Sequence, residues 1–98
     1  MEIKSEITDS KGSFIAQEGE DKIGEMTFSV ANEGQLFIVD HTEVSEKYKG
    51  KGIGQKLFDE LVNSVRKAEV KVMPLCPFVR RMFEKNPDTH DVLRHGSL

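Results

Sequence analysis

The first half of the chain alternates apolar and polar residues, which is typical of β-strands with one buried face. The clearest alternation runs over residues 22–31 and predicts a half-buried strand. Weaker alternation over 3–7 and 13–18 flanks a Thr-Asp-Ser-Lys-Gly segment, whose residues favour turns. We therefore expect a hairpin followed by a longer strand.

The run 36–44, Leu-Phe-Ile-Val-Asp-His-Thr-Glu-Val, is the most β-prone part of the chain. Its first half is apolar on both faces, which predicts a central strand covered from both sides. Its second half is polar, so we expect that part of the strand to emerge into a site.

The second half of the chain changes to helical periodicity. Apolar residues recur at helical spacing over 51–67, and again over 76–85, where a proline suits a helix start. The short run 70–73 is β-prone, and a right-handed crossover would make it parallel to the preceding strand. The tail 88–98 has few apolar anchors, which leaves either partial disorder or a short docked turn.

This order of elements predicts an α+β fold with an α/β-like core. We expect a mixed, mostly antiparallel sheet with a parallel central pair and two helices. The 98 residues are enough for a single domain spanning 1–98.

Composition sets the compartment that we expect. Apolar residues make up 37% of the chain, and no apolar run approaches the roughly 20 residues that cross a bilayer. One cysteine excludes an internal disulfide, and the first residues lack the pattern of a secretory signal. We therefore expect a cytoplasmic protein that does not associate with a membrane.

Charge is unevenly distributed, although the net charge is only −3. Residues 1–46 hold 11 acids and 3 bases, whereas residues 47–98 hold 6 acids and 11 bases. An acidic protein with one local basic cluster does not present the broadly basic surface that nucleic acid needs. We expect no nucleic-acid partner, and a small phosphorylated ligand fits better.

Three glycines, Gly50, Gly52 and Gly54, stand where the second long strand gives way to the helix. Without a Cβ, the backbone can turn sharply and bring N–H groups close to an anion at the positive end of the helix dipole. Lysines surround these glycines at positions 47, 49, 51 and 56. Clustered charges of this kind often form only a solvent-exposed surface with no ligand. The spacing matches neither the dinucleotide fingerprint nor the P-loop.

The segment Lys49-Gly50-Lys51-Gly52-Ile53-Gly54 resembles the acetyl-coenzyme A pyrophosphate loop of the GNAT superfamily of N-acetyltransferases. That pattern is Gln/Arg-x-x-Gly-x-Gly/Ala, and Lys49 replaces its first residue with another donor. The resemblance implies acetyl-CoA as cofactor, with its pyrophosphate on this loop and its pantetheine arm along the end of the 36–44 strand. The cofactor-binding residues implied are Thr42, Val44, Lys49, Gly50, Lys51, Gly52, Ile53 and Gly54.

The chain also departs from that superfamily. The order of elements from about 22 to 87 is similar to the superfamily's core, but the usual N-terminal helices and C-terminal strands are lacking, so the chain looks like a minimal branch. Many members have a tyrosine in the second helix that protonates the leaving thiolate. The only tyrosine here is Tyr48, in the loop. A cysteine, Cys76, stands at the corresponding place instead.

The run Pro-Leu-Cys-Pro-Phe-Val around Cys76 resembles a small cysteine-bearing group of predicted acetyltransferases, in which this cysteine and a strand histidine are the proposed functional pair. The resemblance implies a catalytic role for Cys76 and His41. A thiol before the first turn of a helix meets unpaired N–H groups, which favour the thiolate, but cysteine is also common as a small buried hydrophobe. An imidazole suits a general base near neutral pH, although His41 could equally be a strand residue with one satisfied contact.

The resemblance thus implies an enzyme that transfers an acetyl group from acetyl-CoA to a small-molecule or peptide amine, and we favour direct attack over an acetyl-cysteine intermediate. The alternatives are a non-catalytic module that binds CoA or acyl-CoA, and an interaction protein with a vestigial pocket. The cysteine and histidines show no metal-ligand spacing. We expect a monomer or a weak homodimer.

Overall fold

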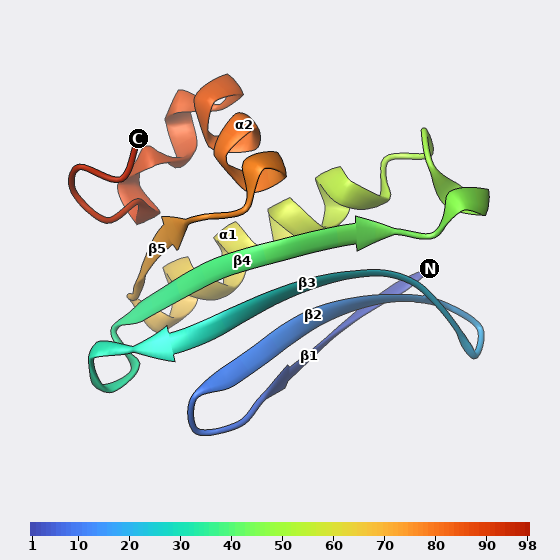
Figure 1. Cartoon of the computed structure of the whole chain (residues 1–98), viewed down its shortest axis with the longest axis horizontal. Coiled ribbons are helices and arrows are strands. Elements are labelled where there is room, and N and C mark those ends of the chain that lie inside the picture. The colour runs from blue at the N-terminus through green and yellow to red at the C-terminus, as the bar shows by residue number, and fades with distance from the viewer.

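The computed structural model describes residues 1–98 as five strands and two α-helices, with three short 3-10 turns (Figure 1). The strands are β1 (Glu2–Ile7), β2 (Lys11–Glu18), β3 (Asp21–Ala31), β4 (Leu36–Val44) and β5 (Lys71–Pro74). The α-helices are α1 (Ile53–Ala68) and α2 (Pro77–Lys85), and the 3-10 turns are Asn32–Gly34, Glu46–Tyr48 and Pro87–Val92.

The strands form one sheet in the order β1-β2-β3-β4-β5. The first three pairings are antiparallel, and β4 pairs with β5 in parallel through the α1 crossover. The predicted α+β fold, a mostly antiparallel sheet with one parallel pair and two helices, is therefore confirmed. The parallel pair lies at the end of the sheet, because the chain leaves the sheet after Pro74, so its expected central position is corrected.

Both helices pack on the same face of the sheet. Met26 and Phe28 of β3 point to this face, and an added Cβ on nearby Gly24 would touch Ile53 and Leu57 of α1. The expectation that 36–44 is covered from both sides is therefore wrong, because the other face of the sheet carries no helix (Figure 1).

The core lies between this face and the two helices. The apolar stripe of α1 is buried, and the ring of Phe58 meets Phe83 of α2 edge-on at 4.9 Å between centroids. Each such side chain contributes about 1.5–3 kcal/mol when it is removed from water. Across the sheet, Phe28 stacks on Phe37 at 4.4 Å. These contacts fix α1 and α2 relative to β4, and so position the two helix starts beside the end of that strand.

The tail is docked, which is one of the two outcomes that its sequence left open. Asp91 accepts two hydrogen bonds from the guanidinium of Arg66, at 2.7 and 3.0 Å. Leu93 forms a parallel bridge with Val72, so the tail covers the outer edge of β5. No helix of the protein is both long and apolar enough to cross a membrane.

Candidate functional site

The two parallel strands separate after Val39. Their pairing ends where Val39 meets Pro74, but β4 continues to Val44 while the chain after β5 turns into α2. The Val39 carbonyl accepts hydrogen bonds from the N–H groups of both Leu75 and Cys76, each at 2.9 Å, which closes the ladder. Beyond this point, one edge of β4 has no strand beside it and is open to a ligand (Figure 1).

A cleft of about 600 Å³ lies at this opening. Its walls come from the end of β4, the glycine loop, the first turn of α1 and one side of α2. The lining residues are Thr42, Glu43, Val44, Tyr48, Lys49, Gly50, Gly52, Ile53, Gly54, Phe78 and Arg81. Seven of the eight cofactor-binding residues expected from the sequence line the cleft. The exception is Lys51, whose ammonium lies 5.5 Å from the centre of the Tyr48 ring.

The start of α1 leaves backbone donors without partners. The first helical hydrogen bond runs from Lys56 N–H to the Gly52 carbonyl, and no side chain caps Gly52. The preceding N–H groups of the helix have no intrahelical acceptor, and Gly52, Ile53 and Gly54 line the cleft. The first turn of α1 carries no acidic residue that would repel an anion. This helix start therefore suits an anion such as a phosphate.

The glycines of the loop serve two different purposes. Gly50 and Gly52 have φ values of +79° and +80°, in the left-handed region that favours glycine, and an added Cβ on either would meet nothing within 4 Å. Gly54 has no such constraint, but an added Cβ would lie 2.7 Å from the Phe78 ring. Gly54 therefore allows α2 to place Phe78 against the start of α1, as one wall of the cleft.

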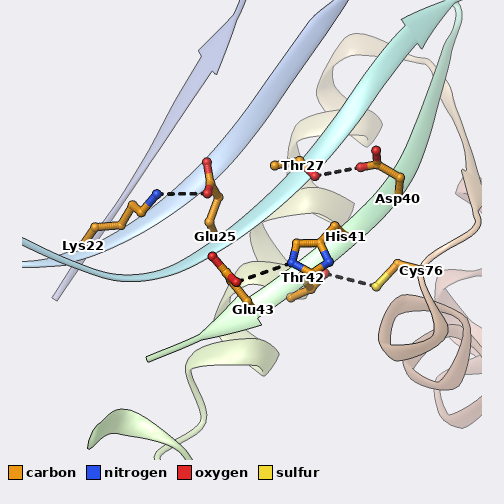
Figure 2. Close-up of polar contacts among 8 residues, drawn as sticks. All are labelled: Lys22, Glu25, Thr27, Asp40, His41, Thr42, Glu43 and Cys76. Carbon is orange, nitrogen blue, oxygen red and sulfur yellow. Dashed lines mark hydrogen bonds and ion pairs between the residues drawn. The ribbon is translucent and has the colours of Figure 1, made fainter. Parts of the chain in front are cut away.

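Cys76 is the residue directly before α2, as expected, and it is only 4% exposed. Its thiol donates a hydrogen bond to Thr42 Oγ1, with 3.4 Å between sulfur and oxygen (Figure 2). Thr42 lines the cleft and Cys76 lies behind it. The only side-chain hydrogen bond of the thiol is therefore to a neutral hydroxyl at the cleft wall.

His41 lies on the opposite face of the sheet from Thr42. It pairs with Thr27, whose hydroxyl donates to Asp40 at 2.7 Å on the face without helices, whereas Thr42 pairs with Met26 of the core. The imidazole is exposed, and its Nε2 lies 3.5 Å from Glu43 Oε2 (Figure 2). No hydrogen bond joins His41 to Cys76, so the structure does not bring this expected pair into direct contact.

A β-bulge at Asp40 explains these directions. The pairing of β3 with β4 shifts between Thr27 and Phe28, so Asp40 is the extra residue on β4. The bulge directs the side chains of both Asp40 and His41 to the face without helices, and the normal alternation of side chains resumes at the next residue. Bulges of this kind are common beside active sites. No residue type in 36–44 indicates where a bulge falls, so the sequence could not place it.

Four cleft residues escaped the sequence analysis: Glu43, Tyr48, Phe78 and Arg81. Phe78 and Arg81 are one helical turn apart on α2, and both line the cleft. Their spacing puts them on the same side of a helix, which was the available signal, but only the packing of α2 against α1 shows that this side faces the glycine loop. Arg81 adds a cation to the cleft wall.

Comparison with known proteins gives the family. A model of the GCN5-related N-acetyl-transferase family matches residues 13–92. A GCN5-like protein from Staphylococcus aureus, solved by NMR, is 30% identical, with 97% of this chain and 92% of that chain covered and a TM-score of 0.67. A search of curated proteins found no match.

Two more distant structures share the fold. A ribosomal-protein-alanine N-acetyltransferase from Brucella melitensis biovar Abortus 2308 is 23% identical over 80% of this chain, with a TM-score of 0.68. This chain spans 62% of the length of that protein. AAC(6')-Iy, in complex with the bisubstrate analogue CoA-S-monomethyl-acetylneamine, is 13% identical, with 84% of this chain and 62% of that chain covered and a TM-score of 0.56.

The chain belongs to the GCN5-related N-acetyltransferase family. The predicted membership of this superfamily is therefore confirmed, and with it the class of N-acetyltransferase and, at the level of the family, acetyl-CoA as the cofactor.

Proposed function

Because the chain is a GCN5-related N-acetyltransferase, we propose that it binds acetyl-CoA in the cleft between β4 and α1 and transfers the acetyl group to an amine. The observation that carries this proposal is the uncapped start of α1, which lies directly beside the open edge of β4. The start of α1 offers unpaired N–H donors for a pyrophosphate. The open edge of β4 offers backbone N–H and C=O groups for the extended, amide-containing pantetheine arm. Bound acetyl-CoA supplies the activated acetyl thioester.

The residues present fit this cofactor. The space around Gly50 and Gly52 is free of other protein atoms, so phosphates can approach the loop backbone. Lys49 of the loop and Arg81 of α2 line the cleft and supply positive charge. Thr42 and Val44 line the cleft on the open edge of β4, where strand-like hydrogen bonds to a pantetheine arm are available.

We assign His41 as the general base. Its imidazole is exposed on the face of the sheet without helices, and its Nε2 lies 3.5 Å from the Glu43 carboxylate. An amine that reaches β4 from this face can pass its proton to His41 as it attacks. A groove of about 450 Å³ lies on the same face, and its lining includes Glu25 and Asp40. These carboxylates favour a cationic acceptor.

We assign Cys76 as the proton donor to the departing thiolate, in a direct transfer. The buried thiol is held by Thr42 at the cleft wall, which suits the delivery of a proton better than attack by an exposed thiolate. A nucleophilic cysteine would form an acetyl-enzyme and would need access to the thioester carbon.

The same observations leave a second candidate. His41 and Cys76 lie on different faces of the sheet and share no hydrogen bond, which is the arrangement expected of a module that binds CoA without chemistry. Turnover distinguishes the two functions.

The test is to measure acetyl-CoA binding by calorimetry and CoA release with a panel of amines, including polyamines, lysine peptides and N-terminal peptides. Binding with amine-dependent CoA release supports the enzyme. Binding without CoA release across the panel supports the non-catalytic module. If acetyl-CoA does not bind, both functions are contradicted.

A further inference from the structure

The outer edge of β1 is uncovered. β1 pairs with β2 in one continuous register, and no other segment of residues 1–98 pairs with its far edge (Figure 1). Two large apolar side chains lie beside this edge, Met1 at 47% and Ile7 at 56% exposure. An exposed strand edge presents a row of unpaired N–H and C=O groups, which is a template for another strand.

A turn hydrogen bond shows which residues of β1 face outward. The N–H of Thr8 donates to the Lys11 carbonyl at 2.8 Å, so the backbone groups of residue 8 point toward β2. Because these groups alternate in direction along a strand and the register has no shift, the other even-numbered residues also face β2. Ile3, Ser5 and Ile7 therefore direct their N–H and C=O groups to the open edge.

The side chains along this edge are self-complementary. The segment Ile3-Lys4-Ser5-Glu6-Ile7 has isoleucine at both ends and opposite charges on either side of a central serine. If two such strands pair antiparallel with Ser5 opposite Ser5, each Ile3 faces an Ile7 and each Lys4 faces a Glu6. A two-fold axis makes every contact twice.

The two neighbouring registers that the backbone permits are unfavourable. Centring the pair on Lys4 would put the two Lys4 side chains together and Glu2 opposite Glu6. Centring it on Glu6 would put two glutamates together. Like charges directly opposite each other destabilise an antiparallel pair. The charges therefore favour the register centred on Ser5 over these two. Centring on Ile3 would put Glu2 opposite Lys4 but would pair only residues 1–5, and centring on Ile7 would pair no opposite charges.

We propose that the protein forms a two-fold homodimer through antiparallel pairing of β1 with β1 of a second copy, centred on Ser5. The outward-facing residues would exchange about six backbone hydrogen bonds, and Lys4 and Glu6 would lie in the closer, non-hydrogen-bonded pairs. An edge contact of this kind is at the small end of interfaces, so we expect a Kd of about 10 µM to 1 mM. The cofactor cleft lies at the opposite end of the sheet and stays accessible. Glu6 and Thr8 also line the groove that we assign to the acceptor, so the dimer is measured in the absence of cofactor and amine.

Charge reversal tests the pairing by sedimentation velocity over a range of protein concentrations. K4E and E6K each replace both attractive contacts by repulsive ones and should weaken the dimer by about tenfold to a few hundredfold. An equimolar mixture of K4E and E6K should recover association, because each carboxylate of one variant then faces an ammonium of the other. The double variant K4E/E6K should also recover it.

Two further variants separate this register from other contacts. Ser5→Pro removes an outward N–H that no intrachain bond uses, so it should abolish the dimer and leave the thermal melt close to wild type. Glu2→Lys is the control, because Glu2 faces the uncharged Thr8 in the Ser5-centred register, and its dimer should be unchanged. A wild-type protein that is monomeric at about 1 mM, or a dimer that Ser5→Pro and K4E leave intact, would overturn the proposal.

Discussion

The two ends of the sheet both leave backbone groups without a strand partner, but their surroundings differ. At one end, β4 outruns β5 after Val39, and the open edge is walled by the start of α1 and by Phe78 of α2. At the other end, the edge of β1 runs without a register shift and has no helix beside it. The open edge of β4 is short and lies in a concave site, whereas the open edge of β1 is continuous and has no other element beside it.

This difference determines what each end can bind. A small ligand needs a concave site that surrounds it, which the walls at the β4 end provide. A second strand needs several alternating backbone groups in a row and space beside them, which only β1 offers. The comparison implies that changes at the cleft should leave the association through β1 unaffected.

The largest effect should come from His41. His41→Ala should lower turnover by about 10²–10⁴-fold and leave CoA affinity nearly unchanged, because a general base acts on the acceptor. Steady-state kinetics and calorimetry on the same preparation measure both quantities. His95→Ala, an exposed histidine in the tail, is the matched control. Wild-type turnover in His41→Ala would remove the imidazole from the mechanism.

The next effect should come from the glycine loop. Gly52→Val should weaken CoA binding by at least about tenfold, since a β-branched residue disfavours the left-handed backbone that aims the first N–H groups of α1. An added side chain at Gly52 would meet no other protein atom, so the loss would not come from a clash within the protein.

Gly19→Val is the control for this variant. Gly19 also has a positive φ, +60°, with nothing within 4 Å, but it lies in the turn between β2 and β3. Both variants should lose similar thermal stability, and only Gly52→Val should lose CoA. If calorimetry finds equal CoA affinity for the two, the pyrophosphate does not lie on this loop.

A smaller loss of rate should follow from Cys76→Ser, because a hydroxyl is a poorer acid than a thiol at neutral pH. Under direct transfer, intact-mass spectrometry of the wild type with acetyl-CoA and no amine should show no acetyl adduct. The control is Thr42→Ser, which keeps the hydroxyl that accepts the thiol proton. A stoichiometric adduct on Cys76, discharged as fast as turnover, would establish the nucleophilic mechanism instead.

The smallest effect concerns the tail that covers the β5 edge. The hydrogen bonds from Arg66 lower the pKa of the Asp91 carboxyl, so this pair stabilises the fold fully above the unfolded value of about 3.9 and loses its effect as pH falls through the lower folded pKa. Asp91→Asn should therefore lower Tm at pH 7 by about 4 °C or less, since the pair is exposed. The difference should vanish in acid. A difference that persists at low pH would mean that the carboxylate charge is not its cause.

The sequence by itself determined much of the fold. The period of two over 22–31 and the helical period over 51–67 correspond to β3 and α1, because burial of one face requires those spacings whatever the neighbours are. The three glycines placed the loop at the start of α1 for a local reason, the left-handed backbone at Gly50 and Gly52. The end of β4 was recognised as polar, and it does line the cleft.

Only the tertiary structure decided where the side chains of the site point. The bulge at Asp40 turns His41 to the open face and leaves Thr42 beside Cys76, and a one-residue irregularity in pairing depends on β3 as much as on β4. The parallel pair lies at the end of the sheet because the chain leaves the sheet after Pro74. Local propensity acts within one segment, whereas register, bulges and the meeting of α2 with α1 are properties of pairs of segments, and these pairings place the cleft.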